Sequence, residues 1–140
     1  MLNTALRFMS ECERRNIKYH DSHDMDDGKS IVICSFNGKN VARLDIFCIF
    51  DAGEKTAGLR VFKLAIVPEE KRSQLLGTLN EINRSYRWLK FIMADDGSIS
   101  MECDAIISAE NSGEICIELM VRAMTVIEEV YPRLMRAIWA

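Results

Sequence analysis

The chain has 140 residues, of which 49% are hydrophobic and 28% charged, and its 18 Lys and Arg against 21 Asp and Glu give a net charge of -3. This length suits one domain with its own core, and the composition is too apolar for an intrinsically disordered chain. The slightly negative charge supplies no positive field for nucleic acid or anionic lipid, so neither is expected as a partner. We expect residues 1–140 to form a single domain that folds without a metal or a disulfide.

The cysteines and the N-terminus indicate a cytoplasmic setting. The five cysteines are odd in number and contain no C-x-x-C pair, which argues against a disulfide framework. Most of them lie in apolar patterns, where a free cysteine behaves as a small hydrophobe. Residues 1–9 lack the apolar run of a signal peptide, and no stretch reaches the roughly 18 apolar residues that a membrane span requires. We therefore expect a cytoplasmic protein without membrane contact.

The chain begins with a predicted amphipathic helix. Apolar residues recur at helical spacing from Leu2 to Cys12, with charged residues between them, and the pattern ends near Asn16. Residues 20–29 are almost entirely polar and are predicted to form an exposed connection, with a short strand before it at residues 17–19.

A meander of three strands is predicted next, at residues 31–36, 41–50 and 59–67. Asn37-Gly38 is a strong hairpin signal between the first two. In the second strand the even-numbered residues are apolar and are predicted to face the core. In the third strand we expect the core face to carry Phe62, Leu64 and Ile66.

A helix and a hairpin follow the meander. Pro68-Glu69-Glu70 is typical of a helix start, and the apolar stripe of this helix consists of Leu75, Leu79, Ile82 and Tyr86. After Trp88 the apolar period becomes two, which predicts an antiparallel hairpin with its turn at Asp95-Asp96-Gly97.

The last predicted helix runs from about Ser112 to Tyr131, where Pro132 kinks it or begins a final short segment. Its polar stripe is narrow, so the helix requires burial on more than one side. One side can pack on the sheet, and we expect another to meet a second subunit. The residues expected at this dimer interface are Leu119, Met120, Ala123, Val126 and Ile127.

The middle of the chain resembles a known family. The segment Leu79-Asn80-Glu81-Ile82-Asn83, followed by Phe91, the turn at Asp95 to Gly97 and the alternating strand from Ser98, resembles the YbjN family, described as regulators of bacterial sensory transduction. The resemblance extends over nearly the whole chain. It rests mainly on core and turn positions, which identify a fold better than an activity.

The resemblance implies an α+β fold like that of type III secretion chaperones. Such a fold has an antiparallel sheet of about five strands with helices packed on it, in the order helix, three-strand meander, helix, hairpin, long helix. It also implies a homodimer that acts as a regulator or chaperone-like adaptor without catalysis.

Other residue groups give weak indications of chemistry. His20 to Asp27 contains imidazoles and carboxylates, but the spacing fails as an EF-hand and no closed ligand set is present, so we expect no metal. Gly28-Lys29-Ser30 resembles the end of a phosphate-binding loop, yet a strand follows it instead of a helix. The mixture of basic and aromatic residues at 84–90 is small for a nucleic-acid site. We expect neither an enzyme nor a cofactor.

A protein-binding surface is the better candidate. Apolar residues occupy positions that the strand patterns place on the outward side, and such residues mark an interface when they cluster. They are Phe47, Ile49, Val61, Trp88 and Ile92. The same pattern also fits residues that close a dimer or lie beneath additional helices.

The alternative is a small-ligand sensor with an apolar pocket between the sheet and a helix. Its lining would come from Met93, Met101, Met120 and Met124, although methionines at such spacings more often fill core gaps.

Overall fold

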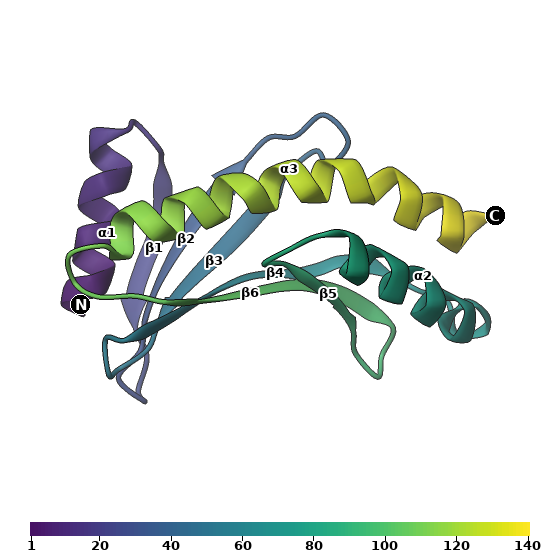
Figure 1. Ribbon diagram of the computed structural model, residues 1–140, viewed down its shortest axis with the longest axis horizontal. Coiled ribbons are helices and arrows are strands. Elements are labelled where there is room, and N and C mark those ends of the chain that lie inside the picture. Colours follow the sequence, from purple (N-terminus) through teal and green to yellow (C-terminus); the bar gives the residue numbers. More distant parts are fainter.

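The computed structural model describes residues 1–140 and shows three α-helices and one sheet of six strands (Figure 1). In chain order the elements are α1 (Asn3–Arg14), β1 (Tyr19–Asp24), β2 (Ser30–Phe36), β3 (Leu44–Phe50), β4 (Thr56–Ile66), a 3-10 turn (Glu69–Lys71), α2 (Arg72–Ser85), β5 (Lys90–Met93), β6 (Ser98–Ile106) and α3 (Ser112–Trp139). The strand order is β1-β2-β3-β4-β6-β5, and every neighbouring pair is antiparallel. The predicted α+β class and order of elements are confirmed.

The sheet has six strands where about five were predicted, and its first strand, β1, overlaps the short strand predicted at residues 17–19 only at Tyr19 and extends into the predicted exposed connection. Tyr19–Asp24 pairs with β2 along the edge of the sheet, and none of its residues is buried. Backbone hydrogen bonds, and not buried side chains, hold this strand in the sheet. Its sequence therefore lacks the alternating apolar residues by which a strand is predicted. Its charged residues also suit an edge, where they discourage pairing with another chain.

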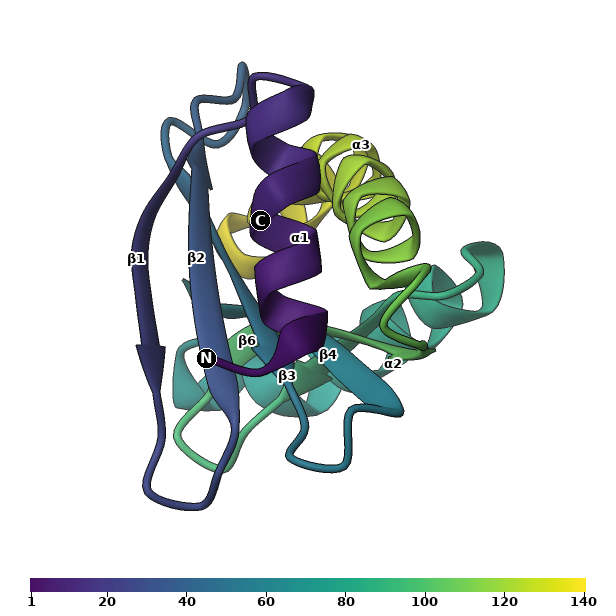
Figure 2. The ribbon, with the colours of Figure 1, turned by 90° about the vertical axis from the view of Figure 1, so that its left-hand side faces the viewer.

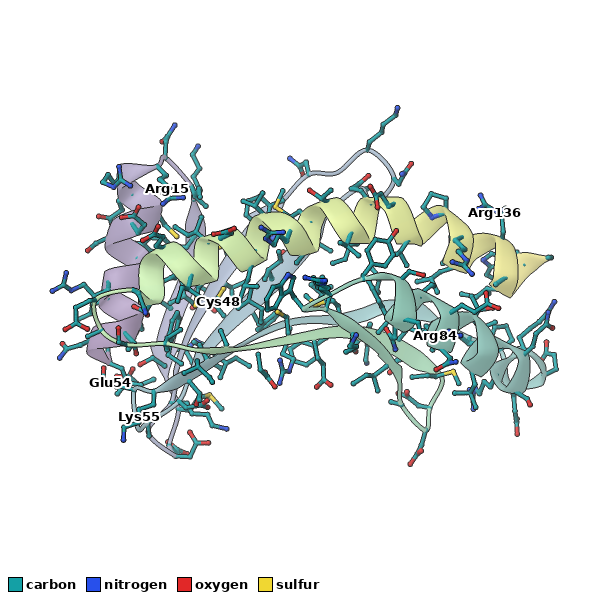
Figure 3. The ribbon with its side chains drawn as sticks, in the orientation of Figure 1. Arg15, Cys48, Glu54, Lys55, Arg84 and Arg136 are labelled. Atoms are coloured by element: carbon teal, nitrogen blue, oxygen red, sulfur yellow. The ribbon has the colours of Figure 1, made fainter.

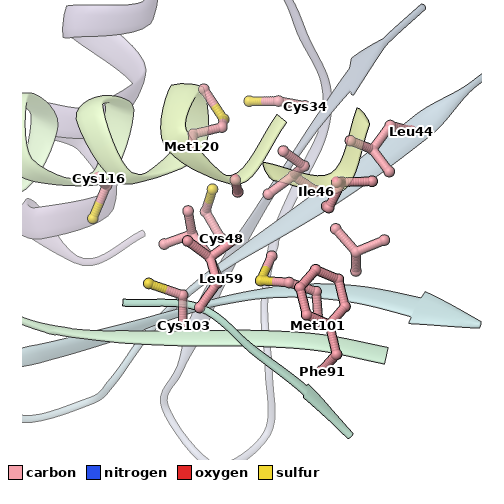
Figure 4. Packing of buried hydrophobic residues seen from close by; sticks show 14 of the residues in the cluster. Cys34, Leu44, Ile46, Cys48, Leu59, Phe91, Met101, Cys103, Cys116 and Met120 are labelled. Carbon is pink, nitrogen blue, oxygen red and sulfur yellow. The ribbon is translucent and has the colours of Figure 1, made fainter. Parts of the chain in front are cut away.

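All three helices lie on one side of the sheet (Figure 2). The core between these two layers contains 31 buried apolar residues in one contiguous cluster. Leu59 and Met101 from the sheet and Met120 from α3 belong to this cluster (Figure 4), and Cys48 lies beneath the same helix (Figure 3). The opposite face of the sheet has no helix over it.

The even-numbered residues of β3 face the core as predicted, but the predicted orientation of β4 is wrong. Val61 is only 4% exposed and lies in the core, whereas Phe62 is 51% and Ile66 63% exposed. The pairing with β6 shifts register between Val61 and Ala65, and Lys63 in this bulge has a φ of 51°. Apolar residues occur at both odd and even positions of this strand, so alternation alone does not determine which set faces inward.

α3 continues through Pro132 to Trp139 without a second segment, which corrects the end predicted near Tyr131. A proline inside a helix removes the hydrogen bond to the carbonyl four residues earlier, here that of Glu128. Asn40 supplies the missing donor, because its side-chain nitrogen lies 2.8 Å from the Glu128 carbonyl oxygen. The loop between β2 and β3 thus stabilises α3 at its proline.

Candidate protein-binding surface

An apolar band crosses the uncovered face of the sheet. Ile33 of β2 is paired with Phe47 of β3, and the rings of Phe47 and Phe62 make an edge contact with centroids 5.1 Å apart. Beyond Phe62, Ser100 of β6 is paired with Ile92 of β5. The band therefore runs from β2 to the opposite edge strand. We call it the open-face band; its apolar members are Ile31, Ile33, Phe47, Ile49, Phe62 and Ile92.

The band is apolar at its centre and charged beside it. Ile33 is only 8% exposed although no helix covers it, and its cross-strand neighbour in the band is Phe47. Next to the band, the guanidinium of Arg60 lies 3.2 Å from Glu102 and 2.9 Å from Asp104, so these charges are paired. An apolar centre with a polar rim is the usual composition of a protein interface.

The structure separates the five residues predicted for a partner-binding face. Phe47, Ile49 and Ile92 lie together on the open face, as their outward positions predict. The outward placement of Val61 is wrong, because this residue is buried, and Phe62 stands in the band instead. The sequence-based prediction missed Ile31, Ile33 and Phe62. Residues 31–36 and 59–67 have apolar residues at both odd and even positions, so the pattern does not show which of them face outward.

Trp88 lies apart from the band, in a groove between β6 and α3. It is 59% exposed and has a φ of 74° in the connection between α2 and β5. The groove has a volume of about 430 Å³, and its apolar wall includes Ala105, Ile106, Ile115 and Leu119. The molecule therefore offers two apolar surfaces, the open-face band and the groove at the edge of β6.

Three of the five residues predicted for a dimer interface on α3 are buried, and two are partly accessible. Met120, Ala123 and Ile127 are fully buried in the core of their own chain, which corrects the expectation that they face a second subunit. These residues turn toward the sheet because they follow one stripe of α3. Leu119 and Val126 are half-buried beside the core and keep part of their surface accessible.

The methionines of the alternative ligand pocket belong to the packing of the core. Met101 and Met120 are fully buried members of the cluster, and Met93 and Met124 pack against it. The principal hollows of the surface are lined by other residues.

The remaining polar groups have structural roles in this fold. His23 in β1 lies 3.6 Å from Asp21, and no group of three or more His, Cys, Asp or Glu side chains is arranged to hold a metal. Gly28 has a φ of 92° in the turn before β2, a conformation that favours glycine. Arg15, Arg84 and Arg136 lie at the C-terminal ends of α1, α2 and α3, respectively (Figure 3).

All five cysteines are free and buried. Burial raises the pKa of the Cys116 thiol to about 12 and also raises the pKa of Cys103. Such thiols are protonated at neutral pH and are poor nucleophiles or metal ligands. No helix combines the length and apolar content that crossing a bilayer requires.

Comparison with known proteins agrees with this fold. No curated protein sequence matches the chain. Among solved structures, it is similar to YbjN from E. coli, described as a putative transcription regulator, with 13% identity, 90% of each chain covered and a TM-score of 0.56. It is also similar to a chain of the ExsC-ExsE complex, with 14% identity, 95% of each chain covered and a TM-score of 0.55.

The family comparison extends over most of the chain. Residues 8–136 match the sequence model of YbjN, whose description is "putative bacterial sensory transduction regulator". The matched range includes the sheet, α2 and nearly all of α3, and it therefore includes the residues of the open-face band. The chain belongs to the YbjN family.

Proposed function

We propose that this protein is a non-catalytic regulator or chaperone-like adaptor of the cytoplasm that binds another protein through the open-face band. The observation that carries the proposal is a set of apolar residues on a sheet face without helices, in which Ile33 pairs with Phe47, the Phe47 ring contacts Phe62, and Ile92 lies on the far strand beyond Ser100. Apolar patches of this kind mark interaction sites in proteins. The similar fold in the ExsC-ExsE complex supports the proposal, because that chain was seen together with a second protein.

The buried cysteines and the lack of a clustered ligand set also favour a binding role. A nucleophilic cysteine requires a lowered pKa, whereas burial raises it for Cys103 and Cys116.

Site-specific photo-crosslinking tests the proposal. A photoreactive phenylalanine analogue placed at Phe62 stands in the band, and the same analogue at Leu76 provides a matched control, because Leu76 is a similarly exposed apolar residue on α2. We expect cells irradiated with the analogue at position 62 to yield an adduct with a second protein, and the position 76 protein to yield none. The adduct is expected to disappear when Phe47→Asp is added. Equal adducts from both positions, or none from position 62, would refute the proposal.

The same experiment distinguishes a homodimer closed by the band. An adduct of two copies from position 62 would assign the band to self-association. A homodimer through α3 is a separate part of the proposal and uses the accessible portions of Leu119 and Val126. Sedimentation at micromolar concentration tests it, with a monomer as the contrary result.

A further inference from the structure

β6 extends past the end of β5 and leaves part of its edge without a neighbouring strand. The last pair between these strands is Lys90 with Glu102, whereas β6 continues to Ile106 along β4. The Ile107 N–H bonds the Lys55 carbonyl over 2.9 Å, and bonded pairs alternate along an antiparallel ladder. The backbone groups of Cys103 and Ala105 therefore face β4, and those of Asp104 and Ile106 face the free edge.

These edge groups have no partner in the chain. None of the backbone hydrogen bonds in turns and loops, and none of the side-chain bonds, involves the N–H or carbonyl of Asp104 or Ile106 on this side. Two N–H groups and two carbonyls are thus available to an added strand. They belong to residues two positions apart, which is the spacing of hydrogen-bonding residues along one edge of a β-strand.

The outer edge of β5 shows the opposite arrangement. The carboxamide of Asn83 donates to the Phe91 carbonyl over 3.0 Å and accepts from the Phe91 N–H over 2.8 Å. One side chain thereby satisfies the outward N–H and carbonyl of Phe91 and blocks pairing at the middle of this strand. The edge of β6 has no such cover, although it lies beside the most exposed apolar residue of the chain, Ile106 at 85%.

The groove beside this edge fits the side chains of an added strand. Its lining includes Trp88, with Ile115 and Leu119 of α3, and also Asp104 and Ile106 of β6, so the groove lies next to the free backbone groups. Every second side chain of a strand points to the same face. One apolar side chain of an added strand would therefore enter the groove while its backbone pairs with β6.

The charges at the groove favour an acidic residue in the same segment. The two carboxylates at the rim are already paired, Glu118 with Arg122 at 2.9 Å and Asp104 with Arg60 at 2.9 Å. Arg87, adjacent to Trp88, has no carboxylate within ion-pair distance. The uncompensated charge beside the groove is therefore positive.

The geometry points to strand addition: an extended segment of the partner protein pairs with Asp104 and Ile106 of β6, places an apolar side chain against Trp88 and an acidic side chain toward Arg87. This inference rests on the proposed function and specifies how the partner is held. A second copy of the chain is a poorer occupant, because its β1 edge is rich in charge and the outer edge of its β5 is closed by Asn83.

The test uses the full chain and a peptide probe. Twelve-residue peptides are selected from a random display library on the wild-type protein, and one is synthesised with a fluorescent label for anisotropy measurements. Ile106→Pro removes the N–H that faces the free edge without touching the bonds to β4, and Ile106→Ala is its matched control because it keeps that N–H. We expect Ile106→Pro to weaken binding by about tenfold or more, since an N–H donor is lost and the ring obstructs the edge, and Ile106→Ala to bind within a few fold of wild type.

Amide hydrogen exchange supplies a second readout. On peptide binding, the amides of Asp104 and Ile106 should gain protection, while those of Cys103 and Ala105 are protected with or without peptide. Circular dichroism of both variants checks that they are folded. Peptides that bind Ile106→Pro as well as wild type, a selection that yields no binder, or self-association that Ile106→Pro abolishes would each overturn the inference. The crosslinking at Phe62 remains an independent measure of the proposed function, so the two can fail separately.

Discussion

Asn40 donates its side-chain amide to the carbonyl of Glu128, the carbonyl that Pro132 leaves without a helical partner. The contact is reinforced in the other direction, because the Glu128 carboxylate accepts the backbone N–H of Asn40 over 2.7 Å and that of Val41 over 3.2 Å. The loop between β2 and β3 thus completes the helix that closes the core. This relationship explains how a 28-residue helix contains a proline without ending there.

A double-mutant cycle between Asn40 and Pro132 tests this explanation. Asn40→Ala removes the substitute donor and is expected to lower the free energy of unfolding by about 1 kcal/mol. In the Pro132→Ala background the cost should be smaller, because a backbone N–H at position 132 restores the helical hydrogen bond. Urea unfolding of the four proteins measures both costs, and equal costs in the two backgrounds would contradict the explanation.

Acid should weaken the same contact. The backbone N–H groups of Asn40, Val41 and Lys39 hold the pKa of Glu128 below its ordinary value of 4.5. A carboxyl group whose folded pKa is depressed stabilises the protein above its unfolded pKa, and this contribution disappears as the pH falls through the folded pKa. We therefore expect Glu128→Gln to be less stable than wild type at pH 7, with the difference shrinking from about pH 4.5 downward. Urea unfolding at pH 7 and pH 3 checks this, and a difference that grows in acid would disprove it.

Adjacent substitutions in β4 should have opposite consequences. Val61→Asp places a carboxylate in the core and is expected to destabilise the fold by about 3 kcal/mol or more. Phe62→Asp alters a residue that is 51% exposed, so its cost should be under about 1.5 kcal/mol. Thermal unfolding of the two variants decides the orientation of the strand. Equal losses would mean that both faces of β4 are covered.

Asn83 should contribute more to the stability of the fold than Asn80, the other asparagine of the segment from Leu79 to Asn83. Asn83→Ala removes two hydrogen bonds and leaves the Phe91 N–H and carbonyl without a protein partner, with an expected cost of about 1–2 kcal/mol. Asn80→Ala is the control, because Asn80 is exposed and makes no hydrogen bond through its side chain. Chemical unfolding measures the loss in free energy of unfolding for both variants. Similar losses would mean that the two hydrogen bonds of Asn83 contribute nothing to stability. Light scattering of Asn83→Ala would show whether the uncovered edge promotes self-association.

Exchange of backbone amides in the free protein should alternate along β6. Asp104 and Ile106 direct their N–H groups to the free edge and are expected to exchange faster than Cys103 and Ala105, which bond β4. Nuclear magnetic resonance resolves these four amides individually. Uniform protection of all four would show that another group covers the edge in solution.

Much of the fold is predictable from local sequence patterns. The elements that were predicted incorrectly depend on contacts between segments that are distant in the sequence. The alternation of 98–107 identifies β6, and Asp95-Asp96-Gly97 forms the predicted turn with Gly97 at a φ of 86°. Both features depend on residues close in sequence. The short strand predicted at residues 17–19 was placed too early and too short, because β1 at Tyr19–Asp24 is held by pairing with β2 and has no buried side chains to mark it in the sequence.

The candidate surface was predictable only in part. Phe47, Ile49 and Ile92 break the polar side of otherwise alternating strands, so their exposure is visible in the sequence. Trp88 has the same signal, but the connection after α2 directs it toward α3 instead of the open face. The contact between Phe47 and Phe62 was not foreseen, because the apolar residues at both odd and even positions of β4 led to the prediction that Phe62 faces the core.

The sequence by itself determined the class of fold, the family, the long apolar stripe of α3 and the hairpin after Trp88, because periodicity and turn residues act over a few neighbouring positions. Only the tertiary structure decided which face of β4 is buried, which edge Asn83 closes and which edge of β6 stays open. Those outcomes depend on where the helices and the partner strands lie. A residue pattern records which side chains share a face, whereas contacts between distant segments decide whether that face meets the core, another strand or solvent.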